Sequence, residues 1–431
     1  MKKDKSQIKW ASIQPLTGGM YLGAELAIGH PAEFILSYEG LDGVTYDKEG
    51  NIKTAGNEYN LVTYLKSKGR MPKYYKFTRA MFDVNTTVLD PEILLEGEKA
   101  TPDYSDLDIV VAVPVCSGLS MVTAAKDDTK EERNCNMVWL AYYTLNVIKP
   151  KVYCFENAPT LMGSRGVVLR KKFETMAREA RYSLLYYKTD TQLHGNPQKR
   201  PRTFVVFIKH DKDVENQYPA VFDYVSNTIT AEEFFKQIDP KASLNTPVKT
   251  AAHNPIVVEF IKNKLGKDWV NIIDGALMNY IIKNKLFDEL VEFTEQIIYD
   301  ETAKEKALKY FKHIAYKTSL GKNYYGDDIC LCRDKFPSVQ FRMIPNMLHP
   351  SGERMCTIRE YLSLMGMPED FVLYGDASNL PKIGQNVPVH TAEYITQQIV
   401  KILDSPFADS TDYNAVYQDN TKQTIKEIEN Y

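Results

Sequence analysis

The sequence predicts an α/β fold with a mostly parallel central sheet, helices on both of its faces, and a second, smaller domain of mixed structure. The first observation is a nearly unbroken β-branched run at 109–113, which is typical of a strand buried on both faces. The second is Pro114, which ends that run because proline has no N–H to give to a sheet. The third is the alternation of strand and helix patterns on either side of this run.

The composition is that of a globular protein able to bury a full core. Of 431 residues, 44% are apolar and 25% are charged, and this length predicts two domains. The net charge of −3 does not demand a nucleic-acid partner, so any basic surface must be local. The six cysteines lack the spacing of a disulfide framework, which predicts a reducing, cytoplasmic location. We predict no signal peptide, no membrane span and no metal site, since Cys330 and Cys332 lack zinc-site spacing.

The chain opens with a predicted strand, loop, helix and strand over residues 11–40. Gly18 and Gly19 lie in the loop, the helix extends to about Gly29, and the second strand at 34–38 ends at Glu39. Glycines at such a place let backbone N–H groups approach an anionic or polar ligand, and an acid at this distance suits ribose hydroxyls. A flexible turn followed by a surface glutamate explains the same residues equally well. Residues 41–107 are predicted to be an insertion with one short strand or turn near 82–84.

The middle of the chain continues the alternation. We predict a helix at 136–147, a strand at 151–155 ending at Glu156, a helix at 167–181, and a strand pair at 183–187 and 203–208. Arg200 and Arg202 directly precede the last of these strands, so their positions are fixed, which suits a planar, acceptor-rich substrate or a phosphate. A further amphipathic helix is predicted at 391–403.

Cys116 lies just beyond the carboxyl end of the predicted central strand, where open α/β sheets bind their ligands. A thiol at that point can be presented to a substrate as a nucleophile. The alternative is a small buried apolar residue, which is what most free cysteines are. Cys116 alone does not decide between the two.

Five blocks of the sequence together resemble the DNA (cytosine-5) methyltransferase family. They follow the family's order and lie at residues 114–120, 155–159, 195–202, 354–368 and 383–389. The first holds Cys116, the second Glu156 followed by Asn157, and the third the Gln198-Lys199-Arg200-Pro201-Arg202 signature. Five blocks in order make coincidence a poor explanation.

The resemblance implies a Rossmann-like methyltransferase domain that uses S-adenosylmethionine to methylate carbon 5 of a cytosine flipped out of double-stranded DNA. Cys116 would add to carbon 6 of the ring and so make carbon 5 nucleophilic. Glu156 would hydrogen-bond or protonate N3, and Arg202, together with Arg200, would hold the O2 side of the ring. The sequence does not name the base that removes the carbon 5 proton.

The resemblance also implies the binding residues. The cofactor would be contacted by Gln14, Leu16, Thr17, Gly18, Gly19, Glu39, Asp83, Val115, Gln385, Asn386 and Val387. The substrate would be contacted by Pro114, Ser120, Asn157 and Gln198.

The first block departs from the family's pattern, which begins with an acid, has an aromatic residue two positions later and carries an extra glycine. The matching positions here hold Ser12, Gln14 and Leu16. Val115 also stands where the family has proline, and Asn386 falls one position late. A modified donor carrying an extra group is compatible with these changes.

The blocks also predict the domains. Residues 1–209 and 346–404 would form the catalytic domain, 210–345 a target-recognition domain, and 405–431 a polar C-terminal tail with partial disorder. Residues 301–345 carry 9 Lys and Arg against 5 Asp and Glu, with aromatic residues between them. This pattern suits phosphate contacts and base readout, whereas most charge runs are only solvated faces.

Three hypotheses of function follow. The chain is an active DNA cytosine-5 methyltransferase, an inactive family member that binds DNA, or a related enzyme that acts on RNA or transfers another group. We expect a monomer encoded by a prokaryote or a phage, associated with the nucleoid and with restriction-modification.

Overall fold

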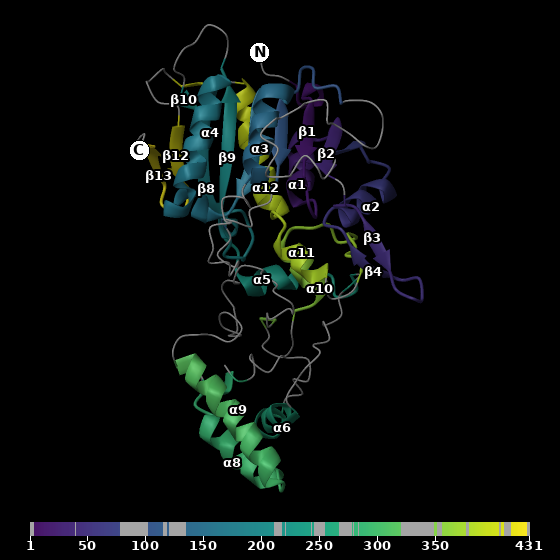
Figure 1. Ribbon diagram of the computed structural model, residues 1–431, viewed down its shortest axis with the longest axis vertical. Helices are drawn as coiled ribbons and strands as arrows, with labels where there is room; N and C mark the ends of the chain where they lie inside the picture. The colour runs from purple at the N-terminus through teal and green to yellow at the C-terminus, as the bar shows by residue number, and fades with distance from the viewer. Residues whose placement is uncertain are drawn as a thin grey trace.

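The computed structural model describes residues 4–38, 40–77, 102–114, 119, 135–210, 218–219, 221–242, 244, 255–266, 278, 280–282, 284–319, 349–350, 356–375, 379–404, 407–408 and 415–428. Its main element is a nine-stranded sheet in the order β13-β12-β8-β9-β7-β6-β1-β2-β5 (Figure 1). The strands are β1 (Trp10–Ile13), β2 (Phe34–Tyr38), β5 (Lys73–Phe77), β6 (Ile109–Ala112), β7 (Val152–Asn157), β8 (Tyr182–Asp190), β9 (Pro201–Lys209), β12 (Ala415–Asp419) and β13 (Thr424–Glu427).

The sheet is mostly parallel, and the α/β prediction is confirmed. Strands β5, β2, β1, β6 and β7 run in one direction, with Ser12 paired to Ile35 on one side and to Val111 on the other. β9 lies antiparallel between β7 and β8. The chain passes from β1 to one side of the sheet and returns to β6 on the other. The carboxyl end of β1 is therefore the point where the strand order reverses, and open α/β sheets bind ligands there.

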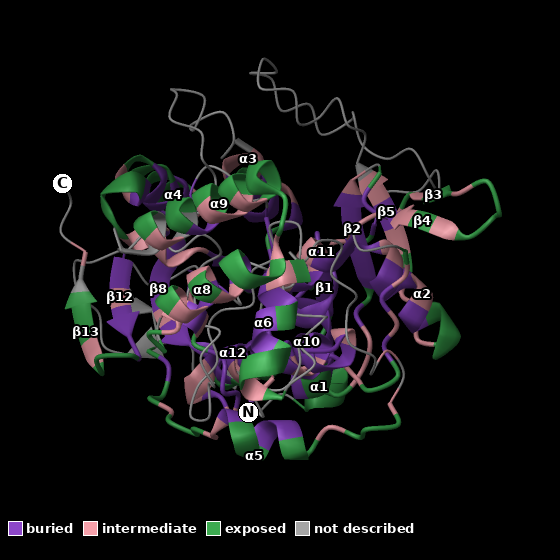
Figure 2. Ribbon diagram, turned by 90° about the horizontal axis from the view of Figure 1, so that it is seen from below, coloured by how far each residue is buried: buried purple, intermediate pink, exposed green. Residues whose placement is uncertain are grey.

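Helices cover both faces of the sheet (Figures 1 and 2). One face carries α1 (Gly19–Ile28), α2 (Tyr59–Ser67), α10 (Ile358–Leu364), α11 (Leu380–Gly384) and α12 (Val389–Asp404). The other carries α3 (Cys135–Tyr143), its π-helical extension η5 (Thr144–Ile148) and α4 (Val167–Glu179). Side chains alternate between the faces along β7, where Cys154 packs under the first group and Phe155 under the second.

Several predicted elements are confirmed with small shifts. The strand, loop, helix and strand at the start correspond to β1, α1 and β2, and the helix ends at Gly29 in the left-handed conformation. The predicted strand pair forms as β8 and β9. The helix predicted at 391–403 begins two residues earlier, as α12.

The interpretation of residues 41–107 as an insertion is wrong for part of that range. The antiparallel pair β3 (Val44–Tyr46) and β4 (Ile52–Ala55) is an added hairpin, but α2 packs on the central sheet and β5 extends it in parallel. β5 is the last strand on this side of the described sheet and has lysines at two of its five positions, so it lacks the apolar run of a central strand. The segment 82–84 lies outside the described residues.

The expected boundary at residue 210 does not match the core. Phe222 and the helix α5 (Ala231–Lys236) bury apolar side chains, including Phe234 and Phe235, in the cluster under α1 and α12. Residues 221–242 and Leu244 therefore pack with the central sheet and not with the second unit. Their polar, proline-bounded sequence hides this, because their partners lie nearly 200 residues further along the chain.

The expectation of partial disorder after residue 404 is wrong for residues 415–428. β12 joins β8 in parallel and β13 pairs with β12 at the edge of the sheet. The polar side chains of β12 have specific partners, since Asp419 pairs with Lys188 at 3.0 Å and Gln418 accepts from the Phe222 N–H at 2.9 Å. Buried polar groups with partners are compatible with a strand, although their composition resembles that of a tail.

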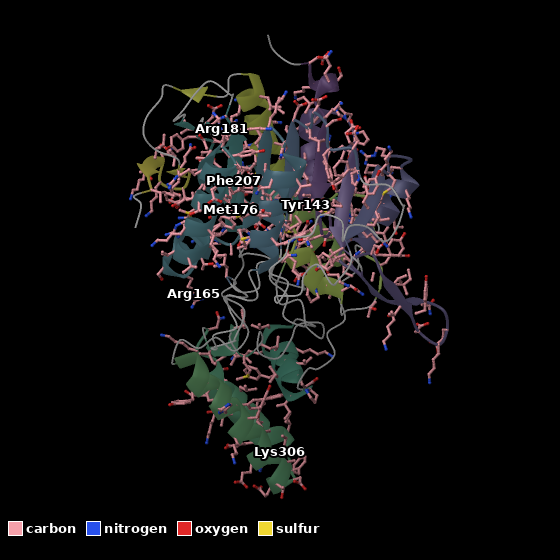
Figure 3. All side chains as sticks on the ribbon, turned by 45° about the horizontal axis from the view of Figure 1, so that its top comes forward. Tyr143, Arg165, Met176, Arg181, Phe207 and Lys306 are labelled. Atoms are coloured by element: carbon pink, nitrogen blue, oxygen red, sulfur yellow. The ribbon has the colours of Figure 1, made fainter. Side chains whose placement is uncertain are left out.

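A separate helical cluster is formed by α6 (Pro255–Leu265), α8 (Phe287–Ile297) and α9 (Glu301–Ser319), which lie below the sheet in Figure 1. Phe311 belongs to its core and is fully buried, so this aromatic residue of the basic segment is not available for base readout. Lys306 is exposed on α9, and Figure 3 shows it in this cluster, apart from Phe207 of the sheet.

Candidate active site

The loop after β1 has an unusual backbone at the switch point of the sheet. Gln14, Leu16 and Gly18 all have positive φ angles, of 49°, 53° and 107°. Only glycine adopts such angles freely, and in the family pattern Leu16 stands at the position of the extra glycine. Leu16 therefore holds a left-handed conformation that a glycine would adopt without strain.

At two positions of the loop, neighbouring atoms leave no room for a side chain larger than that of glycine. A Cβ atom on Gly19 would lie 1.7 Å from the carbonyl oxygen of Val387, and one on Gly18 would lie 2.5 Å from Leu61. Gly19 begins α1, and its N–H donates to the Asn386 side chain at 2.7 Å. The Thr17 hydroxyl donates to the Lys382 carbonyl at 3.0 Å. The first and last sequence blocks are thus brought into direct contact.

Within the last block, the predicted cofactor residues differ in their contacts. Asn386 is buried, and its side chain bonds to Gly19 and to the Met367 sulfur. Gln385 is exposed, and its side chain accepts from Asn57 at 3.2 Å. Asn386 and Val387 therefore shape the loop after β1, whereas Gln385 lies at the surface beside residue 57.

Glu58 is a buried acid next to this loop that no sequence block identified. It precedes α2 and is fully buried, and the Tyr74 hydroxyl donates to its carboxyl group at 2.8 Å. Burial raises the pKa of Glu58 to about 8, and nearby polar groups, among them the Tyr74 hydroxyl that donates to it, oppose that shift. Glu58 is therefore a buried acid beside the loop that holds Leu16. An Asn-Glu pair directly before an apolar helix is too common in sequence to have marked it.

Glu156 and Arg202 form a buried ion pair at the same edge of the sheet. The Arg202 Nε lies 2.6 Å from the Glu156 Oε1, and the two side chains are 17% and 8% exposed. β7 pairs with β9 so that Glu156 faces Phe204, which places Arg202 diagonally across on the same face. Burial raises the pKa of Glu156, and the guanidinium groups of Arg202 and Arg200 oppose that shift. These two predicted catalytic residues are brought together.

Arg200 has a different role from the predicted contact with the cytosine ring. Its guanidinium donates to the carbonyl oxygens of Gly384 and Asn386, at 2.6 and 2.9 Å, and it is 1% exposed. Its backbone N–H donates to the buried carboxylate of Asp190 at 3.0 Å. Arg200 therefore holds the last block against the end of β9. Its charge still acts on Glu156 through space.

Asn157 and Gln198, predicted as substrate contacts, also have internal partners. The Gln198 amide donates to the Leu364 carbonyl at 2.8 Å, which holds α10 against the arginine block. The side-chain oxygen Oδ1 of Asn157 accepts from the Ala158 N–H at 2.8 Å, and the side-chain amide of Asn157 donates to the Met137 sulfur. Both side chains are fully buried, and these bonds position the ends of β7 and β9 on which Glu156 and Arg202 lie.

Pro114 and Leu119, on either side of Cys116 in the sequence, lie at this edge. Pro114 follows β6, and Leu119 is buried, with its carbonyl accepting from the Thr160 hydroxyl at 2.6 Å. Thr160 follows Glu156 by four residues, so the chain returns from the loop directly beside the Glu156 segment. Five predicted site residues lie outside the described residues, namely Glu39, Asp83, Val115, Cys116 and Ser120.

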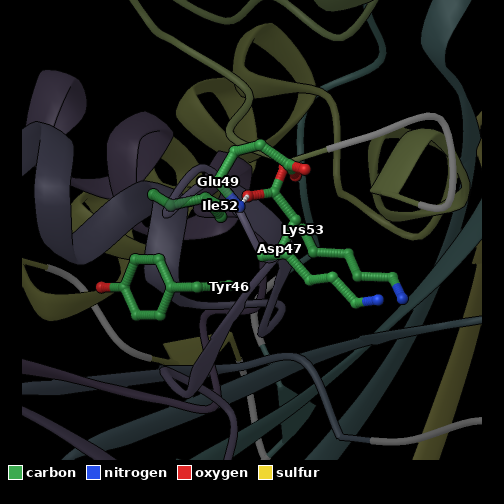
Figure 4. Close-up of a pocket in the computed structure, with 6 residues that line it drawn as sticks. Tyr46, Asp47, Glu49, Ile52 and Lys53 are labelled. Carbon is green, nitrogen blue, oxygen red and sulfur yellow. Dashed lines mark hydrogen bonds between the residues drawn. The ribbon is translucent and has the colours of Figure 1, made fainter.

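A surface concavity of about 500 Å³ lies elsewhere, on the inserted hairpin (Figure 4). Its lining runs from Tyr46 to Lys53, where Asp47 accepts from the backbone N–H groups of Glu49 and Asn51. The described residues contain no cluster of three metal-ligating side chains and no helix long and apolar enough to cross a membrane. The edge that holds Glu156 and Arg202 is thus the candidate active site.

A family model of C-5 cytosine-specific DNA methylases matches residues 74–401, which is more than half of the chain. The chain belongs to this family. The recognition made from five blocks is confirmed, and with it the assignment as a DNA (cytosine-5) methyltransferase. The match to the methylase family begins after the altered first block and after Glu58, so it covers the five blocks of the resemblance and not residues 12–19.

Individual relatives of this methylase are distant. The type II methyltransferase M.DdeI of Desulfomicrobium norvegicum is 22% identical over 377 residues, covering 80% of this chain and 84% of the relative. A solved structure, described as a DNA modification methyltransferase encoded within a prophage of E. coli, aligns over 93% of this chain and 100% of that chain. Its TM-score is 0.50 at 18% identity, which supports the shared methyltransferase fold.

Proposed function

We propose that this methylase transfers a methyl group from S-adenosylmethionine to carbon 5 of a cytosine that has left the DNA duplex, through a covalent bond from Cys116. The observation that carries the proposal is the buried Glu156–Arg202 pair, at 2.6 Å. Pro114 and Leu119 bring the two ends of the Cys116 loop to the same edge of the sheet. Chain connectivity keeps the Cα atoms of Cys116 and Pro114 within about 8 Å of each other.

The reaction needs a nucleophile because carbon 5 of cytosine is too weak to attack a methyl group directly. The Cys116 thiolate forms a bond to carbon 6, and the electrons of the 5,6 double bond move toward N3 and O2. Carbon 5 would then attack the methyl group, whose bond to the sulfonium sulfur would break, so that S-adenosylhomocysteine would leave. Loss of the carbon 5 proton to a base lets the sulfur–carbon 6 bond break, which restores the ring and the thiolate. Since both faces of the ring are used, the cytosine leaves the stack.

Glu156 and Arg202 suit the charge that develops in the first step. Burial raises the pKa of Glu156, so its carboxyl group can share a proton with N3 as negative charge moves there. The Arg202 guanidinium, fixed by this pair, lies where it can stabilise charge on O2. Arg200 contributes as a positioning residue and through its charge, since its own hydrogen bonds go to main-chain carbonyl groups.

The loop after β1 fits the adenosyl part of the donor. The Gln14 amide is fully buried, and neither of its polar atoms has a partner among the described residues, which indicates a place for a ligand. Gln14, Leu16 and Thr17 would hold the cofactor with Gly18 and Gly19, and Asn386 would fix the loop. S-adenosylmethionine supplies an electrophilic methyl group when bound. We place Glu39, Asp83, Val115, Gln385 and Val387 around it as the resemblance implies.

Double-stranded DNA is the proposed macromolecular partner, and α9 offers cationic contacts. Lys306, Lys309 and Lys312 are exposed on this helix, as is Tyr316. Spaced lysines of this kind contact phosphates without reading sequence. Cytoplasmic location in a prokaryote or a phage-infected cell, with a role in restriction-modification, agrees with the type II and prophage descriptions of the relatives.

A covalent trapping experiment tests the proposal. The wild-type protein is mixed with labelled S-adenosylmethionine and duplex DNA containing 5-fluorocytosine, which blocks the final elimination. We expect a stable protein–DNA adduct that carries the label and disappears in Cys116→Ala. Cys154→Ala is the matched control, because Cys154 is a buried core thiol on β7 and its variant should still form the adduct.

The other outcomes separate the remaining hypotheses. A folded wild-type protein that binds DNA without forming an adduct would be an inactive family member. An adduct that persists in Cys116→Ala would overturn the nucleophile. A product base heavier than 5-methylcytosine, or adduct formation with RNA alone, would replace the donor or the substrate.

A further inference from the structure

The backbone hydrogen bonds of the loop after β1 can be accounted for in detail. The Gln14 N–H donates to the Leu36 carbonyl at 2.9 Å, and the Gly18 N–H donates to the Pro15 carbonyl at 2.9 Å. Further along, the Thr17 hydroxyl bonds to the carbonyl of Lys382, next to the last block, and the Gly19 N–H bonds to Asn386 within that block. These bonds to the protein itself hold the loop in place.

Two buried side chains of the same segment have no hydrogen-bond partner among the described residues. The Gln14 amide is 0% exposed, and among the described residues neither its Nε2 nor its Oε1 has a hydrogen-bond partner. The Ser12 hydroxyl, two residues earlier in β1, is also 0% exposed and without a partner in the described part of the chain. Removing such groups from water without a partner is unfavourable, and native structures leave few of them unpaired.

The position of these groups indicates what would pair with them. Gln14 directly follows β1, hydrogen-bonded to Leu36 in the middle of β2, and lies at the reversal of strand order. In the family pattern given above, an aromatic residue stands at this position. An aromatic ring packs or stacks on its neighbours, whereas a carboxamide offers two donor hydrogens and one acceptor oxygen.

We propose that Gln14 is a donor-binding residue whose carboxamide hydrogen-bonds the bound S-adenosyl compound, and that Ser12 adds a second polar group to this site. The inference rests on the proposed function, because it takes the donor to be an adenosyl sulfonium. It predicts two effects of opposite sign. Removing the unpaired amide should stabilise the free protein, and the same change should weaken binding of the donor.

The test compares two buried glutamines that differ in pairing. Gln14→Met keeps the length of the side chain and a Cβ at the same backbone angle, but it cannot form the hydrogen bonds. Gln418→Met is the control, because Gln418 is buried with its amide paired to both the N–H and the carbonyl of Phe222. Both free proteins are melted by calorimetry and titrated with S-adenosylhomocysteine, which binds as the donor does but cannot react.

We expect Gln14→Met to melt at or above the wild-type temperature and to bind S-adenosylhomocysteine about tenfold or more weakly. Gln418→Met should melt at a lower temperature and, where folded, bind as tightly as the wild type. Repeating the titration with 5′-methylthioadenosine, which lacks the amino-acid part, assigns the bond. If Gln14→Met binds 5′-methylthioadenosine more weakly than the wild type does, the hydrogen bond goes to the adenosine part. If both proteins bind it equally well, the hydrogen bond goes to the amino-acid end.

Two results would overturn the inference while leaving the proposed function intact. One is wild-type affinity in Gln14→Met, and the other is a fall in its melting temperature as large as that of Gln418→Met, which would show the amide to be paired in the free protein. A wild-type protein that binds no S-adenosyl compound at all would instead remove the donor assignment of the proposed function.

Discussion

The Arg200 guanidinium holds the carbonyl oxygen of Asn386 at 2.9 Å, across 186 residues of sequence. A second bond, to the Gly384 carbonyl at 2.6 Å, fixes the same turn. The Asn386 side chain in turn accepts from the Gly19 N–H. Arg200 therefore helps to fix the shape of the loop that we assign to the cofactor, while Arg202, two residues later, pairs with Glu156.

Substitution of Arg200 should affect stability and donor binding together. Arg200→Ala removes two charge-assisted hydrogen bonds in a buried place and should lower the free energy of unfolding by about 3 kcal/mol. Calorimetry and titration with S-adenosylhomocysteine measure the two effects. Arg200→Lys should recover only part of each, since lysine lacks the planar fork. Wild-type melting in Arg200→Ala would contradict the positioning role.

Substitution of Arg202 should instead affect catalysis. Arg202→Ala removes the partner of Glu156 and the proposed contact to O2, and we expect kcat to fall by about 10²- to 10³-fold, as for other preorganised donors. The affinity for S-adenosylhomocysteine should remain near that of the wild type, because Arg202 has no bond to the last block among the described residues. Single-turnover methylation of DNA measures the rate. A large change in donor affinity with an unchanged rate would assign Arg202 to the cofactor.

Glu58 should make the folded state less stable as the pH rises. Burial raises the pKa of Glu58 from the ordinary 4.5 to about 8, so the folded state binds the proton more tightly than the unfolded state. Between these two values, raising the pH favours unfolding by about 1.4 kcal/mol per unit from this group. Glu58→Gln removes the titration, so its stability relative to the wild type should increase from pH 5 to pH 8.

Denaturant unfolding of the wild type and Glu58→Gln at several pH values measures that difference directly. The comparison cancels the contributions of the other acids. A constant difference across this range would show that the carboxyl group of Glu58 does not titrate there.

Substitutions of Gly19 and Gly29 distinguish a steric requirement for glycine from a requirement for its backbone conformation. Gly19→Ala would place a methyl group 1.7 Å from the Val387 carbonyl, so it should displace the last block and greatly weaken donor binding. Gly29→Ala meets nothing within 4 Å but has a φ of 98°, so it should cost about 1–2 kcal/mol of stability and leave donor affinity unchanged. Thermal melts and donor titrations of both variants check this, and equal effects on binding would refute the close contact.

The lysines of α9 test the DNA contact. Replacing Lys306, Lys309 and Lys312 by alanine should reduce the slope of log affinity against log salt concentration by up to about 2.7, since each phosphate contact contributes about 0.9. Fluorescence anisotropy with a DNA duplex at several salt concentrations measures the slope. A control variant with Lys422 and Lys426 of the sheet edge replaced should keep the wild-type slope. An unchanged slope in the α9 variant would show that these lysines are only solvated and do not contact DNA.

The parts of the fold that the sequence predicts well are those with local signals. The apolar runs of β6 and β7 and the proline after β6 mark buried parallel strands, and the glycine pair marks the turn before α1. β5 and β12 contain lysine, tyrosine, glutamine and aspartate in place of such runs. Neighbouring strands and side chains accommodate these residues in the sheet. No local pattern shows that Asp419 will meet Lys188 after 231 residues.

The candidate site also contains both features that the sequence predicts and features that it does not. Glu156 and Arg202 were predicted from their blocks, and the register of β7 and β9 brings them together. Arg200 was predicted beside them, but its partners are main-chain carbonyl groups. Because every residue has such a carbonyl group, the sequence does not reveal this contact. Glu58 could not be predicted as a buried acid, because Tyr74 and the Leu16 loop that surround it come from other parts of the chain.

The pairing of β12 with β8 has a consequence for how the protein is made. On the ribosome, β8 emerges more than 200 residues before β12, so one border of the nascent sheet stays open for much of translation. An unpaired strand border is a site for association with other chains. Slowing the final stretch of synthesis should therefore lower the yield of native enzyme more than slowing an earlier stretch of equal length.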